Sequence, residues 1–471
     1  MNKLATPILL LIAMLALSAC DNSNPDDTTN TTNDPGSVVI NGAPVVGATL
    51  TTTVTDSDGI SGTISYAWTA GGSSIGGDTD TYILTLAEVG KVITVTASYT
   101  DDGGTAESPT ASTAAVTNPI TYGPFDKSLI DTSQDCTGGT AIAGGTLTVG
   151  TTWTKANSPY IVSGDVSVGA GDTLTIEAGV TVCADDADGQ SAGVDTAKVE
   201  FLIDGTLVIN GSKTEPVIFR SINADDVNDQ AWHGIIIGSN STGNVIDYAY
   251  MTNGARAVTL GDEFPFPAAD SVTISNSVFE YNLEGVDLAS TGLSIPIDSC
   301  AFVNNKRGVQ TFQGSVYVEN SLFYGNNYGV AAISVKGSTY IELDNVTLDN
   351  NDTGILITPG PDTADVELTN VILTNSTTAG IDNKAAASVV YVSYSNLWNN
   401  PTDGNGTYQA DTTVISADPQ YINAPDYYGI KASSPSVDTG ANIGVTDDIA
   451  GDPRPSGTYH DMGAYEYQQA P

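Results

Sequence analysis

The chain has 471 residues, of which 55 are Asp or Glu and 14 are Lys or Arg, so its formal net charge is −41 at pH 7. A charge this negative excludes ordinary binding to nucleic acid, which needs clustered Lys and Arg, and only two His residues are present for His-based chemistry. Because 40% of the residues are hydrophobic and 49 are Gly, the composition predicts a folded, turn-rich chain rather than a disordered one.

The N-terminus has the features of a bacterial secretion signal. Lys3 precedes a ten-residue apolar run, ILLLIAMLAL at 8–17, which is too short to span a bilayer and has the length of a signal-peptide core. The run leads into LSAC at 17–20, which resembles a lipobox and implies cleavage after residue 19 and lipidation of Cys20. We therefore expect a lipoprotein anchored to a membrane of the cell envelope and facing away from the cytoplasm, with a plain secretory signal as the alternative. Asp21 resembles an inner-membrane retention signal, so the inner membrane stays open beside the outer membrane or cell surface, which we favour.

A polar tether and a small β-domain are expected next. After Cys20, the segment up to residue 36 has no aliphatic or aromatic residue and predicts an extended tether over 20–36. Over 37–117, short alternating apolar runs are separated by turns, which predicts an antiparallel β-sandwich with Trp68 in its core. The segment resembles the Ig-like modules of bacterial surface adhesins, which mostly serve as spacers, through Tyr66, Trp68, Tyr82 and VGKVITV at 89–95.

A repeat with a period of 21 to 28 residues follows a linker and N-terminal cap expected at 118–139. An apolar column recurs at this period, with Met251, Phe279, Phe302, Phe323, Leu348, Leu373 and Trp398. The period is too short for two helices per repeat, and the short β-branched runs predict one coil of a parallel β-helix over 140–425. A leucine-rich horseshoe has a similar period, but its signature is missing.

Polar residues keep fixed distances from this column. Three positions before it stand Asn276, Ser299, Asn320, Asn345 and Asn370, and three positions after it stand Asn282, Asn305, Asn326 and Asn351. We expect these columns in turns, where Asn tolerates left-handed backbone and side-chain amides can bond from coil to coil. Six positions after the apolar column stand Gly285, Gly308, Gly329 and Gly354, which we expect to supply positive φ.

The segment from 140 to 466 resembles the right-handed β-helix proteins of the pectate-lyase-like superfamily. The residues that carry the resemblance are the Trp232-His-Gly234-Ile turn and, in the tail, DPRP at 452–455 and DMGAYE at 461–466. The tail is similar to that of many secreted bacterial β-helix repeat proteins and implies a C-terminal capping segment at 426–471. The resemblance implies a fold and no activity, because this fold hosts lyases, hydrolases, adhesins and scaffolds.

Three cysteines remain after Cys20. Cys300 falls in a column of small inward-facing residues, so we expect a buried free thiol that packs as a small hydrophobe. Cys136 and Cys183 flank the first coil, and we expect them to form a disulfide in an oxidising compartment.

An acidic run marks a predicted loop of the first coils. It contains Asp185, Asp186 and Asp188, and Asp225-Asp226 form a second run further along. Calcium takes carboxylate oxygens readily, so Asp185, Asp186 and Asp188 are candidate calcium ligands, with a solvated acidic loop as the alternative.

Lys306-Arg307 is the only adjacent basic pair in the chain. Arg307 lies five residues after the apolar column, and the same offset gives Glu284 and Arg256 in the two preceding coils. Together with Asn305 these residues form a candidate ligand-binding surface, in which Lys306 and Arg307 are the candidates for the base of a polyuronate lyase. The alternative is a stacked Arg–Glu–Arg ion pair that only neutralises the column.

These features leave three functions open. The favoured one is a surface-anchored envelope lipoprotein without catalytic activity that binds extracellular glycans or partners, in adhesion or as a scaffold. The second is a polysaccharide lyase or a related enzyme that acts on a uronate polymer; the paired-Asp and Gly-His-Gly pattern of polygalacturonases is absent. The third is a purely structural stalk.

Overall fold

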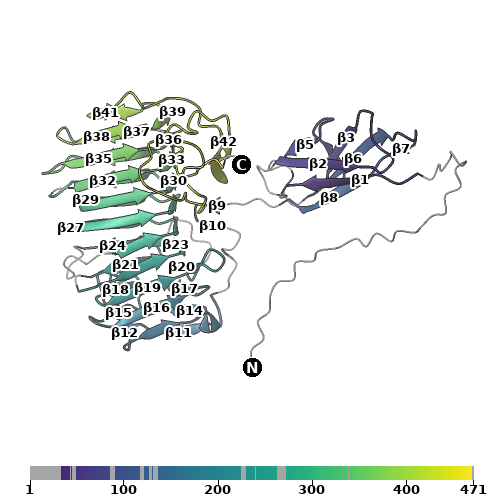
Figure 1. The fold of residues 1–471 in the computed structure, drawn as a ribbon. Coiled ribbons are helices and arrows are strands. Elements are labelled where there is room, and N and C mark those ends of the chain that lie inside the picture. The colour runs from purple at the N-terminus through teal and green to yellow at the C-terminus, as the bar shows by residue number, and fades with distance from the viewer. Residues whose placement is uncertain are drawn as a thin grey trace, which may run out of the picture. The chain divides into compact units, whose positions relative to one another are not determined.

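The computed structural model describes residues 33–42, 44, 49–84, 88, 91–116, 121–126, 130, 136–223, 230–238, 240–261, 272–337 and 339–468. The chain divides into two compact units, one of residues 1–44 and 48–116 and the other of residues 45–47 and 117–471 (Figure 1). The signal peptide, Cys20, most of the tether and Asp225-Asp226 lie outside the described residues. Within the described part of the chain, no helix is long and apolar enough to cross a membrane.

The first unit consists of two antiparallel sheets, as a β-sandwich-like module does. The smaller sheet has the order β1 (Ser37–Asn41), β2 (Thr49–Thr55), β5 (Thr81–Ile83). The larger has β4 (Ser73–Ile75), β3 (Ser65–Ala70), β6 (Val92–Thr100) and β7 (Ala106–Glu107), with β8 (Thr110–Ala115) also paired to β6. Trp68 is 1% exposed and its indole N–H donates to the Thr79 carbonyl at 2.8 Å, so it fills the core as predicted.

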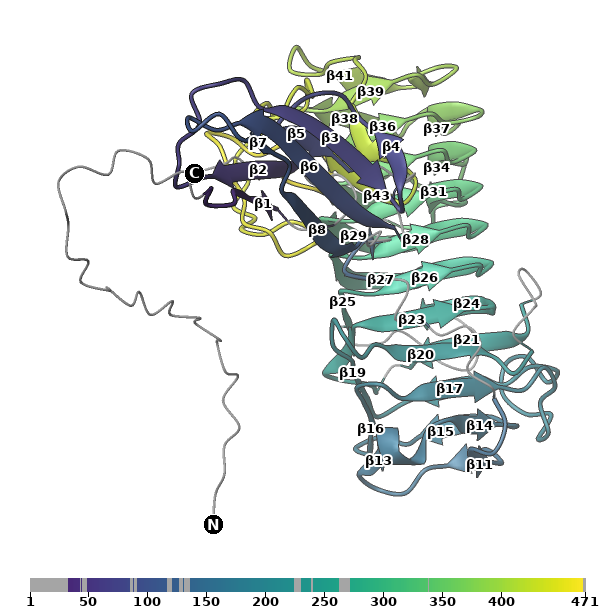
Figure 2. The same ribbon diagram turned by 90° about the vertical axis from the view of Figure 1, so that its right-hand side faces the viewer.

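The second unit is a parallel β-solenoid, which confirms the predicted β-helix. One sheet has eleven strands: β11 (Thr140–Ile142), β14 (Tyr160–Val162), β17 (Thr181–Ala184), β20 (Val217–Ser221), β23 (Ala249–Thr252), β26 (Val278–Glu280), β28 (Ala301–Val303), β30 (Leu322–Tyr324), β33 (Thr347–Asp349), β36 (Ile372–Thr374) and β39 (Asn396–Trp398). Its strands stack one above the next, each from a successive coil (Figure 2).

The other sheet of the solenoid has twenty strands and wraps around the rest of each coil. They are β12 (Gly145–Thr146), β13 (Thr151–Trp153), β15 (Val166–Val168), β16 (Thr173–Glu177), β18 (Glu200–Ile203), β19 (Thr206–Asn210), β21 (Trp232–Ile237), β22 (Asn244–Asp247), β24 (Gly254–Leu260), β25 (Val272–Ser275), β27 (Glu284–Asp298), β29 (Arg307–Glu319), β31 (Tyr328–Ala332), β32 (Thr339–Asp344), β34 (Thr353–Ile357), β35 (Ala364–Thr369), β37 (Ala379–Asn383), β38 (Val389–Ser393), β40 (Gly404–Asn405) and β41 (Tyr408–Ala410). Two short hairpins, β9 (Thr121–Tyr122) with β10 (Phe125–Asp126) and β42 (Tyr421–Asn423) with β43 (Tyr427–Ile430), lie outside both sheets.

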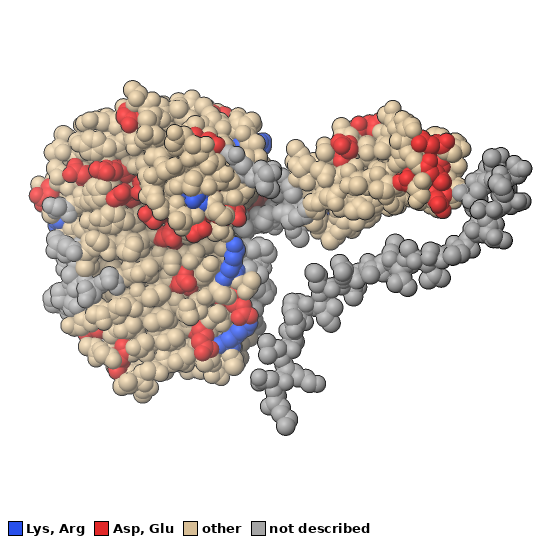
Figure 3. Space-filling view, in the orientation of Figure 1, with Lys and Arg blue, Asp and Glu red and all other residues tan. Residues whose placement is uncertain are grey.

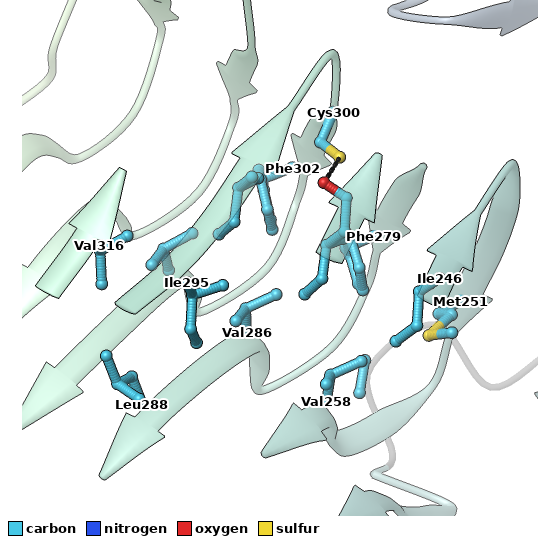
Figure 4. Packing of buried hydrophobic residues seen from close by; sticks show 14 of the residues in the cluster. Ile246, Met251, Val258, Phe279, Val286, Leu288, Ile295, Cys300, Phe302 and Val316 are labelled. Atoms are coloured by element: carbon cyan, nitrogen blue, oxygen red, sulfur yellow. Dashed lines mark hydrogen bonds between the residues drawn. The ribbon is translucent and has the colours of Figure 1, made fainter. Parts of the chain in front are cut away.

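The predicted apolar column lies in the core between the sheets. Phe279, Phe302 and Phe323 occupy equivalent positions on β26, β28 and β30, and all three are fully buried. Their rings stack face to face, with centroids 5.0 Å apart for the first pair and 4.7 Å for the second. Figure 4 shows Phe279 and Phe302 packed beside the aliphatic side chains of the other sheet.

The polar column before the apolar one adopts left-handed backbone, as predicted. Its φ angles are 47° at Asn276, 53° at Ser299, 46° at Asn320, 53° at Asn345 and 58° at Asn370. Each of these residues lies in a turn between a strand of the twenty-stranded sheet and the following strand of the eleven-stranded sheet. Asn and Ser tolerate this conformation because their short polar side chains can form local hydrogen bonds.

The second Asn column forms a buried ladder of hydrogen bonds between coils. The backbone N–H of Asn282 donates to the Oδ1 atom of Asn305 at 2.9 Å, that of Asn305 to Asn326 at 2.9 Å, and that of Asn326 to Asn351 at 3.0 Å. All four residues are at most 3% exposed. The ladder therefore satisfies polar groups that would otherwise be buried without partners.

The glycine column has a different cause from the predicted one. Gly285, Gly308, Gly329 and Gly354 do not have positive φ. A Cβ atom added to Gly308 would lie 2.6 Å from the Gly329 carbonyl oxygen and 2.7 Å from the Phe323 ring. Glycine is required here because the backbone of the next coil and the stacked ring approach too closely for any side chain.

The C-terminal segment, predicted to cap the end of the stack, lies instead along its side (Figure 1). Tail residues Tyr428, Ile449 and Tyr465 form a hydrophobic cluster with Val278 and Leu322, which point outward from the eleven-stranded sheet. The tail therefore covers an apolar sheet face that would otherwise be exposed to water.

The tail motif that carried the family resemblance contains a buried ion pair with further hydrogen bonds to the backbone. Arg454 pairs with Glu466 at 3.0 Å, and both side chains are fully buried. The Arg454 guanidinium also donates to the Gly463 carbonyl at 2.7 Å, while Glu466 accepts backbone N–H groups from Ser456 and Asp461 at 2.8 and 2.9 Å. These residues are thus occupied in folding the tail.

Two of the remaining cysteines form a disulfide at the start of the solenoid. It joins Cys136 to Cys183, which are 47 residues apart in sequence. Cys300 is a free, fully buried cysteine, and burial raises the pKa of its thiol well above the usual range. Its thiol packs in the core beside the Phe279–Phe302 stack (Figure 4).

Candidate functional site

Three of the candidate residues form one ion-paired column on adjacent strands of the twenty-stranded sheet. Arg256 on β24 is in register with Glu284 on β27, which is in register with Arg307 on β29. The Glu284 carboxylate lies 2.9 Å from Arg256 Nε and 2.6 Å from Arg307 Nη1. The Glu284 side chain is 5% exposed, while those of Arg256 and Arg307 are 29% and 21% exposed.

A β-bulge in the neighbouring strand pair lies beside this column. Gly234 on β21 is paired with Arg256 on β24, and the pairing then shifts by one residue, so that Ile235 is paired with Val258. Gly234 has a φ of 146°, and a Cβ atom there would lie only 1.6 Å from the Arg256 carbonyl oxygen. Glycine is therefore required at this position of the predicted turn motif, because the backbone of Arg256 approaches too closely for a side chain.

Asp287, which the sequence did not single out, lies behind the ion-paired column. Its carboxylate is 3.7 Å from Arg256 Nε and accepts a hydrogen bond from the Gln310 side chain at 3.0 Å. Burial first, and then the neighbouring Glu284 carboxylate, raise the pKa of Asp287 to about 6. The only sequence signal was its position immediately after the inward-facing Val286, which would normally place it on the solvent side of the strand.

Lys306 and Arg307 are neighbours in sequence but lie in different surroundings. Lys306 is exposed and lines a pocket of about 260 Å³ at the turns that lead into β27, β29 and β31. The pocket is otherwise lined by Gln230, Tyr281, Asn282, Leu283, Asn304, Asn305 and Asn327. Among the described residues, no carboxylate forms an ion pair with the Lys306 amine. The sequence identified this lysine but none of the pocket's outer residues.

Asn305 is not available to a ligand in the way the sequence suggested. It is 1% exposed, its Oδ1 atom accepts the Asn282 backbone N–H, and its side-chain N–H groups donate to the Phe279 carbonyl at 2.9 Å and to Asn326 at 3.1 Å. Asn305 therefore forms the floor of the pocket as a member of the buried ladder.

The candidate calcium ligands do not converge. The Asp186 carboxylate accepts hydrogen bonds from Ser221 Oγ at 2.7 Å and from the Asn223 side chain. Asp188 is 8% exposed and accepts the backbone N–H groups of Gln190 and Ala192, each at 2.8 Å. Across the described ranges, no group of three or more His, Cys, Asp or Glu residues is placed to hold a metal ion.

A second set of ionisable groups, of which the predicted turn motif contained only His233, fixes the same loop. Glu200 is fully buried and accepts the backbone N–H groups of Val194 at 2.7 Å and Asp195 at 2.6 Å. Asp165 accepts the Glu200 backbone N–H at 2.9 Å, and burial raises the pKa of Asp165 to about 6. His233 lies 3.6 Å from Glu200, and burial lowers its pKa. These groups hold the loop between β17 and β18 against the solenoid.

Comparison with known proteins supports the fold and leaves the activity open. Residues 145–260 match the family model of the pectate-lyase like beta helix domain. A solved structure, that of the Family 28 exopolygalacturonase of Yersinia enterocolitica, is 12% identical over 81% of this chain and 96% of that chain, with a TM-score of 0.30. A likeness this low carries no argument about function. The search of curated proteins found no match.

The family match is confined to residues 145–260, and the parallel solenoid topology of that segment agrees with it. The fold provides the scaffold, and the function depends on particular residues at its surface.

Proposed function

We propose that this protein is a lipid-anchored protein of the cell envelope whose β-helix binds an acidic glycan without cleaving it, through the pocket around Lys306. The observation that carries the proposal is that Lys306 is exposed and lines a polar pocket. The charged residues of the neighbouring column, Arg256, Glu284 and Arg307, are already ion-paired with one another. The first unit then serves as a spacer between the anchor and the β-helix.

The charge around this pocket suits an anion. The chain has only 14 Lys and Arg residues in all, yet Arg256, Lys306 and Arg307 lie on neighbouring coils, where they outnumber the carboxylates of Glu284 and Asp287. A local excess of cations is required for an acidic ligand to approach a chain with a net charge of −41.

The other groups of the pocket suit a saccharide. The side chains of Gln230, Asn304 and Asn327 offer amide donors and acceptors, and Tyr281 adds a half-buried aromatic ring. Polar groups of this kind can fix the orientation of a bound saccharide, and the aromatic ring offers it an apolar surface.

The residues of the ion-paired column offer no base for β-elimination. A lyase needs a group that is free to accept a proton from the substrate. The Arg307 guanidinium donates to Glu284 at 2.6 Å, and a guanidinium in a salt bridge has no acceptor atom to offer. Glu284 and Asp287 are 4% and 1% exposed, so neither carboxylate reaches a bound polymer.

A glycan array, run with and without calcium, tests this function when unsaturated-product release is assayed in parallel. We expect binding to uronate-containing glycans, weaker or no binding to neutral ones, and no released product. Release of unsaturated oligosaccharides would establish the lyase instead, and an array without any bound glycan would leave a structural stalk as the function.

A further inference from the structure

A second surface of the solenoid combines carboxylates with exposed tyrosines. On the outward side of β29, β32, β35 and β38, one register column contains Tyr317, Glu342, Glu367 and Tyr391 in that order. The neighbouring columns add Tyr340, Asp365, Glu319 and Asp344. We call these eight residues the acidic tyrosine face. Figure 3 shows acidic atoms gathered over the part of the solenoid where Figure 1 labels β32 and β35.

The carboxylates of this face are not compensated by cations. None of the five forms an ion pair within the described part of the chain, and Glu342 and Glu367 are directly opposite each other on adjacent parallel strands, about 4.8 Å apart at the backbone. Like charges in this position destabilise a sheet. Glutamine would fill the same positions without that cost, so the fold itself does not require these charges.

The pKa values of two carboxyl groups of the face are raised by burial and by neighbouring carboxylates. Burial first, and then the Glu342 and Glu319 carboxylates, raise the pKa of Asp344 to about 7. Burial, followed by Asp298 and Glu342, also raises the pKa of Glu319. A cationic ligand would relieve both effects, because it favours the ionised form of each carboxyl group.

The tyrosines give the face an aromatic surface as well. Tyr317 and Tyr391 are 37% and 44% exposed, and the Tyr340 ring lies 5.8 Å from that of Tyr317. Beyond Tyr391, a pocket of about 270 Å³ is lined by Glu367, Tyr391, Gln409 and Asp411 among others. The face therefore extends over several coils, which suits a linear ligand better than a single ion.

We propose that the acidic tyrosine face binds an extended, arginine- and lysine-rich polypeptide segment of a partner protein. Guanidinium groups match carboxylates with two hydrogen bonds and also stack on tyrosine rings, so one residue type satisfies both parts of the face. The partner is a separate molecule, because the 14 basic residues of this chain include only one adjacent pair. This site is independent of the glycan pocket.

Fluorescence anisotropy of a labelled oligoarginine peptide, titrated with the full chain, tests the proposal. We expect binding, and a loss of about tenfold or more in affinity, equivalent to about 1.4 kcal/mol, for the double variant Glu342→Gln with Glu367→Gln. Tyr391→Ala should also weaken binding, by a smaller factor. Thermal melts of each variant verify that the fold is retained.

The matched control is Asp80→Asn with Glu177→Gln, which removes two exposed carboxylates elsewhere and gives the same change in net charge. Its affinity should stay within about twofold of the wild-type value, because distant exposed charges are screened by salt. An equal loss in the control would attribute binding to net charge and overturn the proposal. No binding by the wild type would also overturn it, as would preferential binding of a cationic polysaccharide at the same face.

Discussion

At the scale of single residues, Glu284 has the central position in the candidate site. Its carboxylate pairs with Arg256 on one neighbouring coil and with Arg307 on the other. Glu284 is nearly buried, and its replacement would remove the carboxylate that both guanidinium groups share, although Asp287 would remain 3.7 Å from Arg256. Removal of one arginine, by contrast, leaves the remaining pair intact.

We therefore predict that replacing Glu284 lowers the free energy of unfolding more than replacing Arg307 does. Glu284→Gln should lower the free energy of unfolding by about 3 kcal/mol, as expected when one partner of a buried pair is removed. Arg307→Gln should cost only about 1 kcal/mol, because Arg256 still neutralises Glu284. Denaturant melts of both variants measure the difference, and equal losses would contradict the paired geometry.

Asp287 predicts a pH dependence of stability. Its pKa is raised to about 6, whereas an unfolded Asp titrates near about 3.9. The folded chain therefore keeps a proton that the unfolded chain releases, so this contribution to stability is complete below about pH 4 and is lost as the pH rises through about 6.

The variant Asp287→Asn isolates this contribution, because asparagine stays neutral at every pH. Between pH 5 and pH 7.5 the wild type should lose about 1 kcal/mol more stability than the variant. Free energies of unfolding at the two pH values provide the measurement. The same pH dependence in both proteins would show that Asp287 is ionised throughout.

At the scale of structural elements, the asparagine ladder holds successive coils in register. Asn326 donates its backbone N–H to Asn351 and accepts the backbone N–H of Asn305. Asn326→Ala should cost about 2–3 kcal/mol, because it leaves the buried Asn305 N–H without an acceptor. Asn327→Ala, at the exposed neighbouring position, should stay within about 0.5 kcal/mol of the wild type. Denaturant melts that matched for the two variants would reject the ladder as a source of stability.

The elements that could be predicted from the sequence are those set by a repeated local cause. The stacked column of Phe279, Phe302 and Phe323 follows from the period alone, and the left-handed turns at Asn276 and Asn320 follow from the preferences of asparagine. The glycine column was found for the wrong reason. Its cause is the close approach of the next coil. This approach depends on the spacing between coils, which cannot be read from the sequence of a single repeat.

The candidate site was only half predictable for a related reason. The register that joins Arg256, Glu284 and Arg307 could be counted along the sequence, and the structure brings them together. Lys306 and Arg307 could not be distinguished from the sequence, since their surroundings differ only once the turn is folded. Asp287 was not identified from the sequence. Its strand position is expected to face outward, and the residues that bury such a position come from elsewhere in the chain.

At the scale of the whole molecule, the tail shows the limits of local reasoning. Its motif suggested a cap, but the Tyr428 hydroxyl donates to Asp349 at 2.8 Å across 79 residues of sequence, and the Gly463 backbone N–H donates to the Asn370 carbonyl at 2.7 Å. Contacts over such distances place the tail on the side of the sheet. No periodic pattern encodes them.

The location of the molecule is tested at its N-terminus. If LSAC at 17–20 is a lipobox, Cys20→Ser removes the lipidated thiol and should move the protein from the membrane fraction to the soluble fraction. Cell fractionation followed by immunoblotting makes the comparison. Retention of the serine variant in the membrane fraction would contradict the expected lipid anchor.

The central claim is that the exposed lysine of the turn pocket recognises an acidic glycan while the arginines beside it stabilise the fold. Calorimetric titration of an acidic oligosaccharide identified on the array tests it, with Lys306→Glu compared with Lys431→Glu, an exposed lysine outside the pocket. Lys306→Glu should weaken binding by about tenfold or more at unchanged stability, and Lys431→Glu should bind as the wild type does. Equal affinity of the two variants would contradict the claim.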